Sequence, residues 1–170
     1  AAPEICITYM LTYLRCYANG LSSLDVSNNT LLTRLDCYNN ELSSLDISNN
    51  TKLTYLWCYA NELLSLDVSN NTQLISLFCN NNGLSSLDVS HNTYLEKLSC
   101  SYNFLESLDI SNNVGIEHFD CSSNPGKDGV FKILAWFDNV SIPARPDFDF
   151  TTGSWEFGGQ TVEVDYVKLK

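Results

Sequence analysis

The chain has 170 residues, of which 44% are hydrophobic, so it is long enough and apolar enough to build a continuous core. Its 20 acidic side chains outnumber the 9 basic ones, and the net charge of −11 argues against nucleic-acid binding, which needs clustered Lys and Arg. The longest apolar stretches, such as residues 133–137, are too short to span a bilayer, so we expect no membrane insertion.

Residues 1–10 show only a weak version of the periodic pattern that begins at Leu11. Ile5 and Ile7 are their candidate inward positions, and we expect a degenerate N-terminal coil over this range. No signal peptide precedes Ala1-Ala2-Pro3, which fits a mature end after export as well as a trimmed chain.

From residue 11 onward, six of the seven cysteines recur every 21 positions. They are Cys16, Cys37, Cys58, Cys79, Cys100 and Cys121. The cysteines belong to the unit LxxLxCxxNxLxxLDVSxNTx, in which leucine, asparagine, aspartate and serine also recur in fixed columns. Self-similarity at a fixed period of this length indicates a solenoid.

Each unit contains the alternation expected of a strand with one buried face, because the second leucine and the cysteine of LxxLxC lie two positions apart. One coil buries five or six side chains, worth about 1.5–3 kcal/mol each. Ordering its backbone costs about 1–2 kcal/mol per residue. A single coil is therefore unstable, and stacked neighbours must supply the remaining stabilisation.

The unit is similar to the 21-residue bacterial leucine-rich repeats of the internalin J type, in which cysteine replaces a strand leucine. The resemblance covers residues 11–124, about two thirds of the chain. It implies a leucine-rich-repeat right-handed solenoid with a parallel β-sheet on its concave face and little or no α-helix. It also implies a secreted or cell-surface protein that binds other macromolecules. The segment after Asn124 does not resemble the immunoglobulin-like domain that follows the repeats in internalins.

After the repeats, residues 125–129 read Pro-Gly-Lys-Asp-Gly, which is a strong turn signal. Residues 130–137 and 161–169 have the pattern of strands. The segment is rich in aromatic residues: Trp136, Phe137, Phe148, Phe150, Trp155, Phe157 and Tyr166. We expect residues 125–170 to form a small β-rich C-terminal cap over the last coil, with a separate binding module as the alternative.

The cysteine and asparagine columns have structural interpretations. The cysteines share the inward face with the leucines, and in-register side chains keep their Cβ atoms farther apart than a disulfide allows, so we expect reduced, buried thiols. No C-x-x-C pair exists and no His shares the inward columns, which disfavours metal binding. The state of Cys6, outside the repeat, is left open. Asparagine side chains at tight turns bond to backbone groups, and we expect this of the whole asparagine column.

An aspartate column leaves two alternatives open. It comprises Asp25, Asp46, Asp67, Asp88 and Asp109. These carboxylates would repel one another unless something balances them. We expect each to accept hydrogen bonds from backbone N–H groups or hydroxyls of the Ser and Thr around it. Calcium bound between coils is the alternative, because hard cations prefer oxygen ligands.

Strand residues beside the buried Leu and Cys are expected to point outward, and these positions vary from coil to coil. In the first four coils they are rich in aromatic and Arg residues. The candidate ligand-binding residues are Tyr13, Arg15, Tyr17, Arg34, Tyr38, Tyr55, Trp57, Tyr59 and Phe78. They span an area on the order of 200 Å², which suits a peptide or a short glycan. A whole protein face needs about 800 Å² and would extend to the rim at Arg15, Arg34 and Asp36. Alternatively, the rings simply stack and stabilise the sheet.

Catalysis has little support in the sequence. His118 and Asp120 share the outward face with Ser99 and Ser101, but a flat strand surface offers no pocket and no oxyanion hole. We therefore expect no enzyme activity and no cofactor. The predicted function is a non-catalytic binding module for a protein or peptide partner on the concave face. A carbohydrate-binding module and a structural spacer remain the alternatives.

Overall fold

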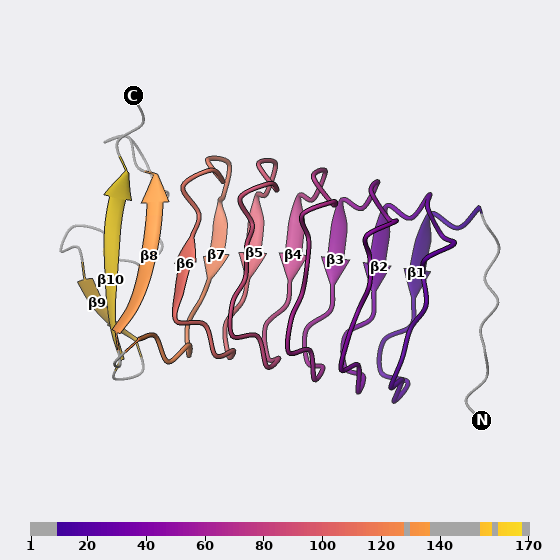
Figure 1. Cartoon of the computed structure of the whole chain (residues 1–170), viewed down its shortest axis with the longest axis horizontal. Helices are drawn as coiled ribbons and strands as arrows, with labels where there is room; N and C mark the ends of the chain where they lie inside the picture. Colours follow the sequence, from indigo (N-terminus) through magenta and orange to yellow (C-terminus); the bar gives the residue numbers. More distant parts are fainter. Residues whose placement is uncertain (1–9, 128–129, 137–153, 158–159, 168–170) are drawn as a thin grey trace.

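The computed structural model describes residues 10–127, 130–136, 154–157 and 160–167. Residues 135–136, 154–157 and 160–167 are described by their backbone alone. All regular elements in these ranges are strands (Figure 1). They are β1 (Tyr13–Arg15), β2 (Arg34–Asp36), β3 (Tyr55–Trp57), β4 (Ser76–Phe78), β5 (Lys97–Ser99), β6 (Ser107–Asp109), β7 (His118–Asp120), β8 (Val130–Trp136), β9 (Ser154–Phe157) and β10 (Gln160–Val167).

A parallel sheet of six strands runs along one side of the coils in the order β1-β2-β3-β4-β5-β7 (Figure 1). Its register pairs Leu14 with Leu35, Leu35 with Leu56, and so on to Phe119, so each coil contributes the same position of the repeat. The predicted solenoid with a parallel sheet is confirmed.

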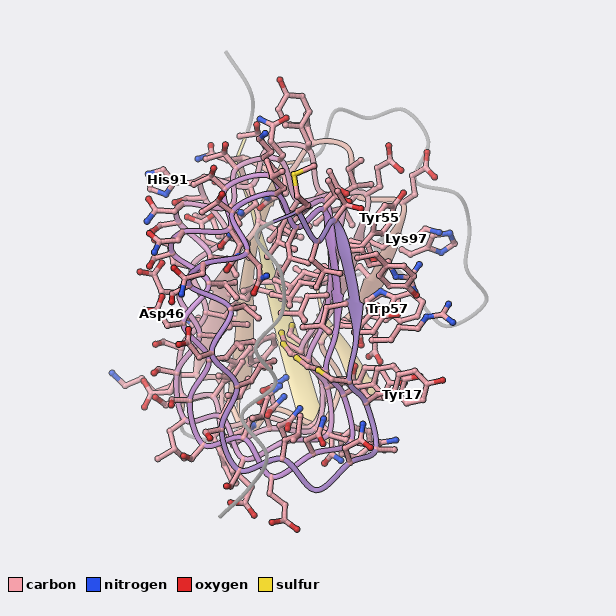
Figure 2. All side chains as sticks on the ribbon, turned by 90° about the vertical axis from the view of Figure 1, so that its right-hand side faces the viewer. Tyr17, Asp46, Tyr55, Trp57, His91 and Lys97 are labelled. Carbon is pink, nitrogen blue, oxygen red and sulfur yellow. The ribbon has the colours of Figure 1, made fainter. Side chains whose placement is uncertain are left out.

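The core lies inside the coils and is built from the repeated apolar columns. Leu35, Leu56 and Leu77 from the sheet are fully buried, and Val68 packs from the opposite half of the coil. The six ladder cysteines are buried and free, with their sulfur atoms inside the coils (Figure 2). The expected inward position of the thiols is confirmed, because the alternation of LxxLxC places them on the leucine side of each strand.

A tight turn follows each strand and depends on the asparagine column. The residue before each asparagine has a φ between 52° and 56°, as in Asn81 before Asn82. The Asn82 amide donates to the carbonyl oxygens of Cys58 and Cys79 at 3.1 and 3.0 Å, and its oxygen accepts the N–H of Leu63 at 3.1 Å. The expected structural role of this column is confirmed.

A second asparagine column, which the sequence analysis did not single out, binds the opposite half of each coil. The fully buried Asn71 amide donates to the carbonyl oxygens of Ile47 and Asn50 in the preceding coil, at 3.1 and 2.9 Å. Asn50, Asn92 and Asn113 repeat this pattern. The solenoid is therefore bonded through side-chain amides on both sides of its core.

A second sheet has the order β6-β8-β10-β9 and closes the C-terminal end of the described coils (Figure 1). Strand β8 pairs in parallel with β6 of the fifth coil, and Phe131 and Ile133 of β8 belong to the core. The strands expected over 130–137 and 161–169 are present as β8 and β10. The boundaries proposed for the degenerate coil, the repeats and the cap stay predictions.

Several expectations fall outside the described residues. They concern Cys6, the degenerate coil over residues 1–9, the turn residues 128–129 and the cap aromatics, whose side chains are not described. Within the described part of the chain, no helix is long and apolar enough to cross a membrane.

Candidate binding surface

The candidate residues lie on what we call the sheet face, the outward side of β1–β5 and β7 together with the residue after each ladder cysteine. Figure 2 shows Tyr17, Tyr55 and Trp57 on this side of the coils and Asp46 on the opposite side. The in-register pairing brings the variable residues of successive coils side by side. We call the part contributed by the first four coils the aromatic half.

Three tyrosines form a stack along one edge of the aromatic half. The ring centroids of Tyr17 and Tyr38 are 4.5 Å apart, those of Tyr38 and Tyr59 are 4.4 Å apart, and the planes are within 8° of parallel. They occupy the same repeat position, so the coil spacing itself sets the stacking distance. Most of their ring faces are therefore covered by one another.

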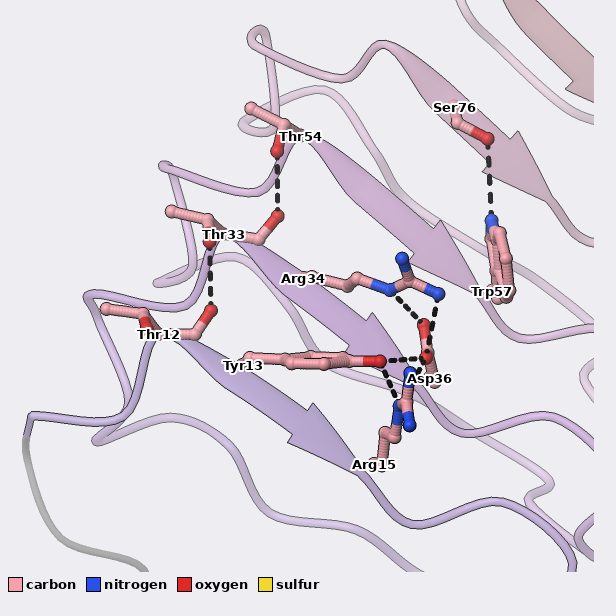
Figure 3. Close-up of polar contacts among 9 residues, drawn as sticks. All are labelled: Thr12, Tyr13, Arg15, Thr33, Arg34, Asp36, Thr54, Trp57 and Ser76. Atoms are coloured by element: carbon pink, nitrogen blue, oxygen red, sulfur yellow. Dashed lines mark hydrogen bonds and ion pairs between the residues drawn. The ribbon is translucent and has the colours of Figure 1, made fainter.

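A second stack joins β3 and β4. The rings of Trp57 and Phe78 are 5.6 Å apart and inclined by 8°, and Trp57 Nε1 donates to Ser76 Oγ at 3.4 Å (Figure 3). The ring centroids of Tyr38 and Trp57 are 6.5 Å apart and the two ring planes are tilted, so Tyr38 links the two stacks. Trp57 and Phe78 are half-buried by these contacts, yet they remain on the outward side.

Arg34 binds the carboxylate of Asp36 on the same strand. Its Nε and Nη2 donate to the two carboxylate oxygens at 2.8 and 3.0 Å, and the Tyr13 hydroxyl donates to Oδ2 at 2.9 Å (Figure 3). The guanidinium carbon lies 4.2 Å from the ring centroid of Trp57 and 5.0 Å from that of Tyr13. Hydrogen bonding to Asp36 raises the pKa of Arg34, which keeps it charged.

Arg15 lies at the N-terminal edge of the same group. Its Nε donates to the Tyr13 hydroxyl and lies 3.6 Å from Asp36 Oδ2. Its guanidinium carbon is 4.9 Å from the Tyr13 ring centroid. The bond to Tyr13 raises the pKa of Arg15. We call Tyr13, Arg15, Arg34 and Asp36 the arginine–aspartate cluster.

The expected exposure of Asp36 at the rim of the surface is wrong. The side chain is only 2% exposed, because Arg34 and Tyr13 close over its carboxylate. Ser101 was also expected to point outward, and it is buried, as is Ser76 before Leu77 on β4. Small or short side chains on this face are covered by the longer neighbours of adjacent coils.

The C-terminal half of the sheet face is polar. Lys97 and His118 are exposed, and Asp120 accepts the backbone N–H of Ser122 at 3.1 Å. Other exposed apolar side chains, among them Leu64 and Phe104, lie at coil positions outside the sheet face and were not singled out from the sequence. Among the described residues, no group of three or more His, Cys, Asp or Glu is arranged to hold a metal ion.

The aspartate column is held by local hydrogen bonds. Asp67 Oδ1 accepts the backbone N–H of Ser69 at 2.9 Å, and Asp25, Asp46, Asp88 and Asp109 repeat this contact. Hydrogen bonding from Ser69 lowers the pKa of Asp67. The expected bonding to the neighbouring serines is confirmed.

No protein-family model and no curated protein matches the chain. Among solved structures, it is similar to the functional domain of InlJ from Listeria monocytogenes, which includes a cysteine ladder. The sequence identity is 37% and the TM-score is 0.68, over 75% of this chain and 32% of the InlJ chain in that structure.

An internalin from the same species, InlF, shares the fold at 17% identity and a TM-score of 0.60, over 86% of this chain and 52% of InlF. The chain thus spans a third to a half of the structures it matches. The in-register coils, the six buried thiols and the likeness to InlJ identify this chain as a leucine-rich-repeat protein of the cysteine-ladder type.

Proposed function

We propose that the aromatic half of the sheet face binds an extended peptide segment of a protein partner, without catalysis. The observation that carries this proposal is the continuous set of stacked rings and arginines at positions that the repeat leaves variable. The location that the repeat type implies, secreted or on a cell surface, belongs to the same proposal.

The packing of the rings favours tight recognition. Each aromatic side chain is held by its neighbours, so little rotational freedom remains to be lost when a ligand binds. Aromatic and Arg side chains are also the types that dominate binding energy at protein interfaces. The area, on the order of 200 Å², suits a peptide better than a whole protein surface.

The same packing favours a peptide over a glycan as the ligand of this surface. A sugar ring binds an aromatic side chain through the open face of the ring. Tyr38 is stacked on both neighbours, and Trp57 has Arg34 from β2 on one side and Phe78 from β4 on the other. The edges and hydroxyl groups that remain are suited to hydrogen bonds and to side-chain contacts with a peptide.

The test is a selection from a random peptide display library against the whole chain. Enriched peptides are expected to bind the Trp57→Ala/Tyr59→Ala variant at least about tenfold more weakly, a difference of about 1.4 kcal/mol. The control is Tyr94→Ala/Phe104→Ala, which removes two exposed rings outside the sheet face. Its affinity should be unchanged.

A purely structural role for the rings predicts the opposite pattern. The double variant at Trp57 and Tyr59 would then lower the melting temperature, and no enriched peptide would depend on the two rings. Peptides that bind this variant as well as the original chain would refute the proposal.

A further inference from the structure

The arginine–aspartate cluster contains two guanidinium groups and one carboxylate. Both oxygens of the Asp36 carboxylate are already occupied, by Nε and Nη2 of Arg34 and by the Tyr13 hydroxyl. The cluster therefore has an excess of one positive charge on a chain whose net charge is −11. Such a local excess, opposite in sign to the whole protein, is a candidate for charge recognition.

The excess charge is located on Arg15, because the two arginines are used differently. Arg34 directs its fork at Asp36 and its side chain is 28% exposed, whereas that of Arg15 is 60% exposed. Only Nε of Arg15 has a partner among the described residues, so the edge formed by Nη1 and Nη2 is unused. That edge matches the spacing of the two oxygens of a carboxylate.

Arg15 is also held in position. The Tyr13 hydroxyl accepts a hydrogen bond from Nε, and the guanidinium carbon lies over the Tyr13 ring, 4.9 Å from its centroid. An arginine that is oriented in this way loses less freedom when it forms a bidentate pair than a mobile surface lysine does.

We propose that Arg15 is an anion-binding position, and that the peptide bound by the aromatic half presents an Asp or Glu carboxylate to Nη1 and Nη2. This inference rests on the proposed function and names the chemistry of its ligand. Charge complementarity supports the acidic partner, since the cluster is the place in the first two coils of the sheet face where positive charge exceeds negative.

The test compares peptide selections on the original chain and on Arg15→Gln. The original chain should enrich peptides in Asp and Glu next to an aromatic residue, and Arg15→Gln should lose the acidic preference. A representative synthetic peptide and its Glu→Gln or Asp→Asn version then give a double-mutant cycle with both proteins.

Each single change should weaken binding about tenfold, as expected for a hydrogen-bonded charge pair. The two changes together should weaken it no further, because both remove the same contact. The control Lys52→Gln removes one positive charge from an exposed position outside the sheet face and should leave the affinity unchanged.

The outcomes separate the inference from the proposed function. Peptides that depend on Trp57 and Tyr59 but show no acidic preference, or a cycle in which the two changes are additive, would overturn the inference and leave the proposed function standing. If no enriched peptide depends on these rings, the proposed function fails and the inference fails with it.

Discussion

Replacing Asn82 by Ala tests whether the side-chain amides hold the coils together. The substitution removes the bonds to the carbonyl oxygens of Cys58 and Cys79 and to the N–H of Leu63. These three backbone groups lie in the interior around a side chain that is 9% exposed, so solvent does not readily replace the lost partner.

A buried donor or acceptor left without a partner costs about 1–3 kcal/mol. Only the N–H of Leu63 is left without a partner, because the carbonyl oxygens of Cys58 and Cys79 each keep a second bond, from Asn61 and from Asn103. With one stranded donor and two further bonds lost, we expect Asn82→Ala to lower the free energy of unfolding by roughly 2–4 kcal/mol. Urea denaturation followed by tryptophan fluorescence measures this loss.

The matched control is Asn70→Ala, because Asn70 is the same residue type but is exposed on the opposite half of the coil. Its substitution should change stability by less than about 0.5 kcal/mol. A loss below about 1 kcal/mol for Asn82→Ala would show that the column is not what holds the turns.

Three further predictions follow from local environments. At about pH 8 a thiol reagent should modify Cys16 before Cys58 in the folded protein, because Cys16 is 5% exposed and Cys58 is fully buried. Burial raises the pKa of Cys16 to about 11 and raises the pKa of Cys58 well above its usual value; mass spectrometry of labelled peptides shows the order of modification. Ser69→Ala should raise the pKa of Asp67, measured by NMR titration, because the serine lowers it. The contact between Ser69 and Asp67 stabilises the folded state at pH values above the pKa of Asp in the unfolded chain. This stabilisation is lost as the pH falls through the lower pKa of Asp67 in the folded state. Gly126→Ala should cost more than about 2 kcal/mol in urea unfolding, because Gly126 has a φ of 65° and a Cβ would lie 2.2 Å from the carbonyl four residues on.

The two substitutions have controls in the same chain. Gly83→Ala should cost little, because its closest contact is the tip of the exposed, movable Leu64 side chain. Ser65→Ala, in the same coil as Ser69, should not move the pKa of Asp67. Faster labelling of Cys58 than of Cys16 would contradict the assigned burial.

The features that repeat from coil to coil were predictable from the sequence. Leu56 and Cys58 must face the same way because strand side chains alternate, and every copy repeats the assignment. The same redundancy identifies the first asparagine column, since a polar residue kept at one position of every turn needs a common partner.

The features that vary were harder to predict. The burial of Asp36 depends on the side-chain conformations of Tyr13 in the first coil and Arg34 in the second. No other two successive coils have a Tyr followed by an Arg at this position of the repeat. The second asparagine column was hidden by adjacent asparagines. The fourth coil distinguishes the two positions, because it has His91 at the exposed one and keeps Asn92 at the buried one.

The hydrogen bonds of the first asparagine column, which runs from Asn40 to Asn124, also give the solenoid a direction. The amide of Asn40 completes the turn of the coil before it, and the same holds down the chain to Asn124, which receives the N–H of Leu105. If coils were deleted from the beginning, the new first asparagine would face solvent, as the exposed Asn19 does now. If the coil carrying Asn124 were deleted, the interior N–H of Leu105 would lose its acceptor. Shortened versions of this protein should therefore be cut from the N-terminal side, and added coils should be inserted ahead of the last one.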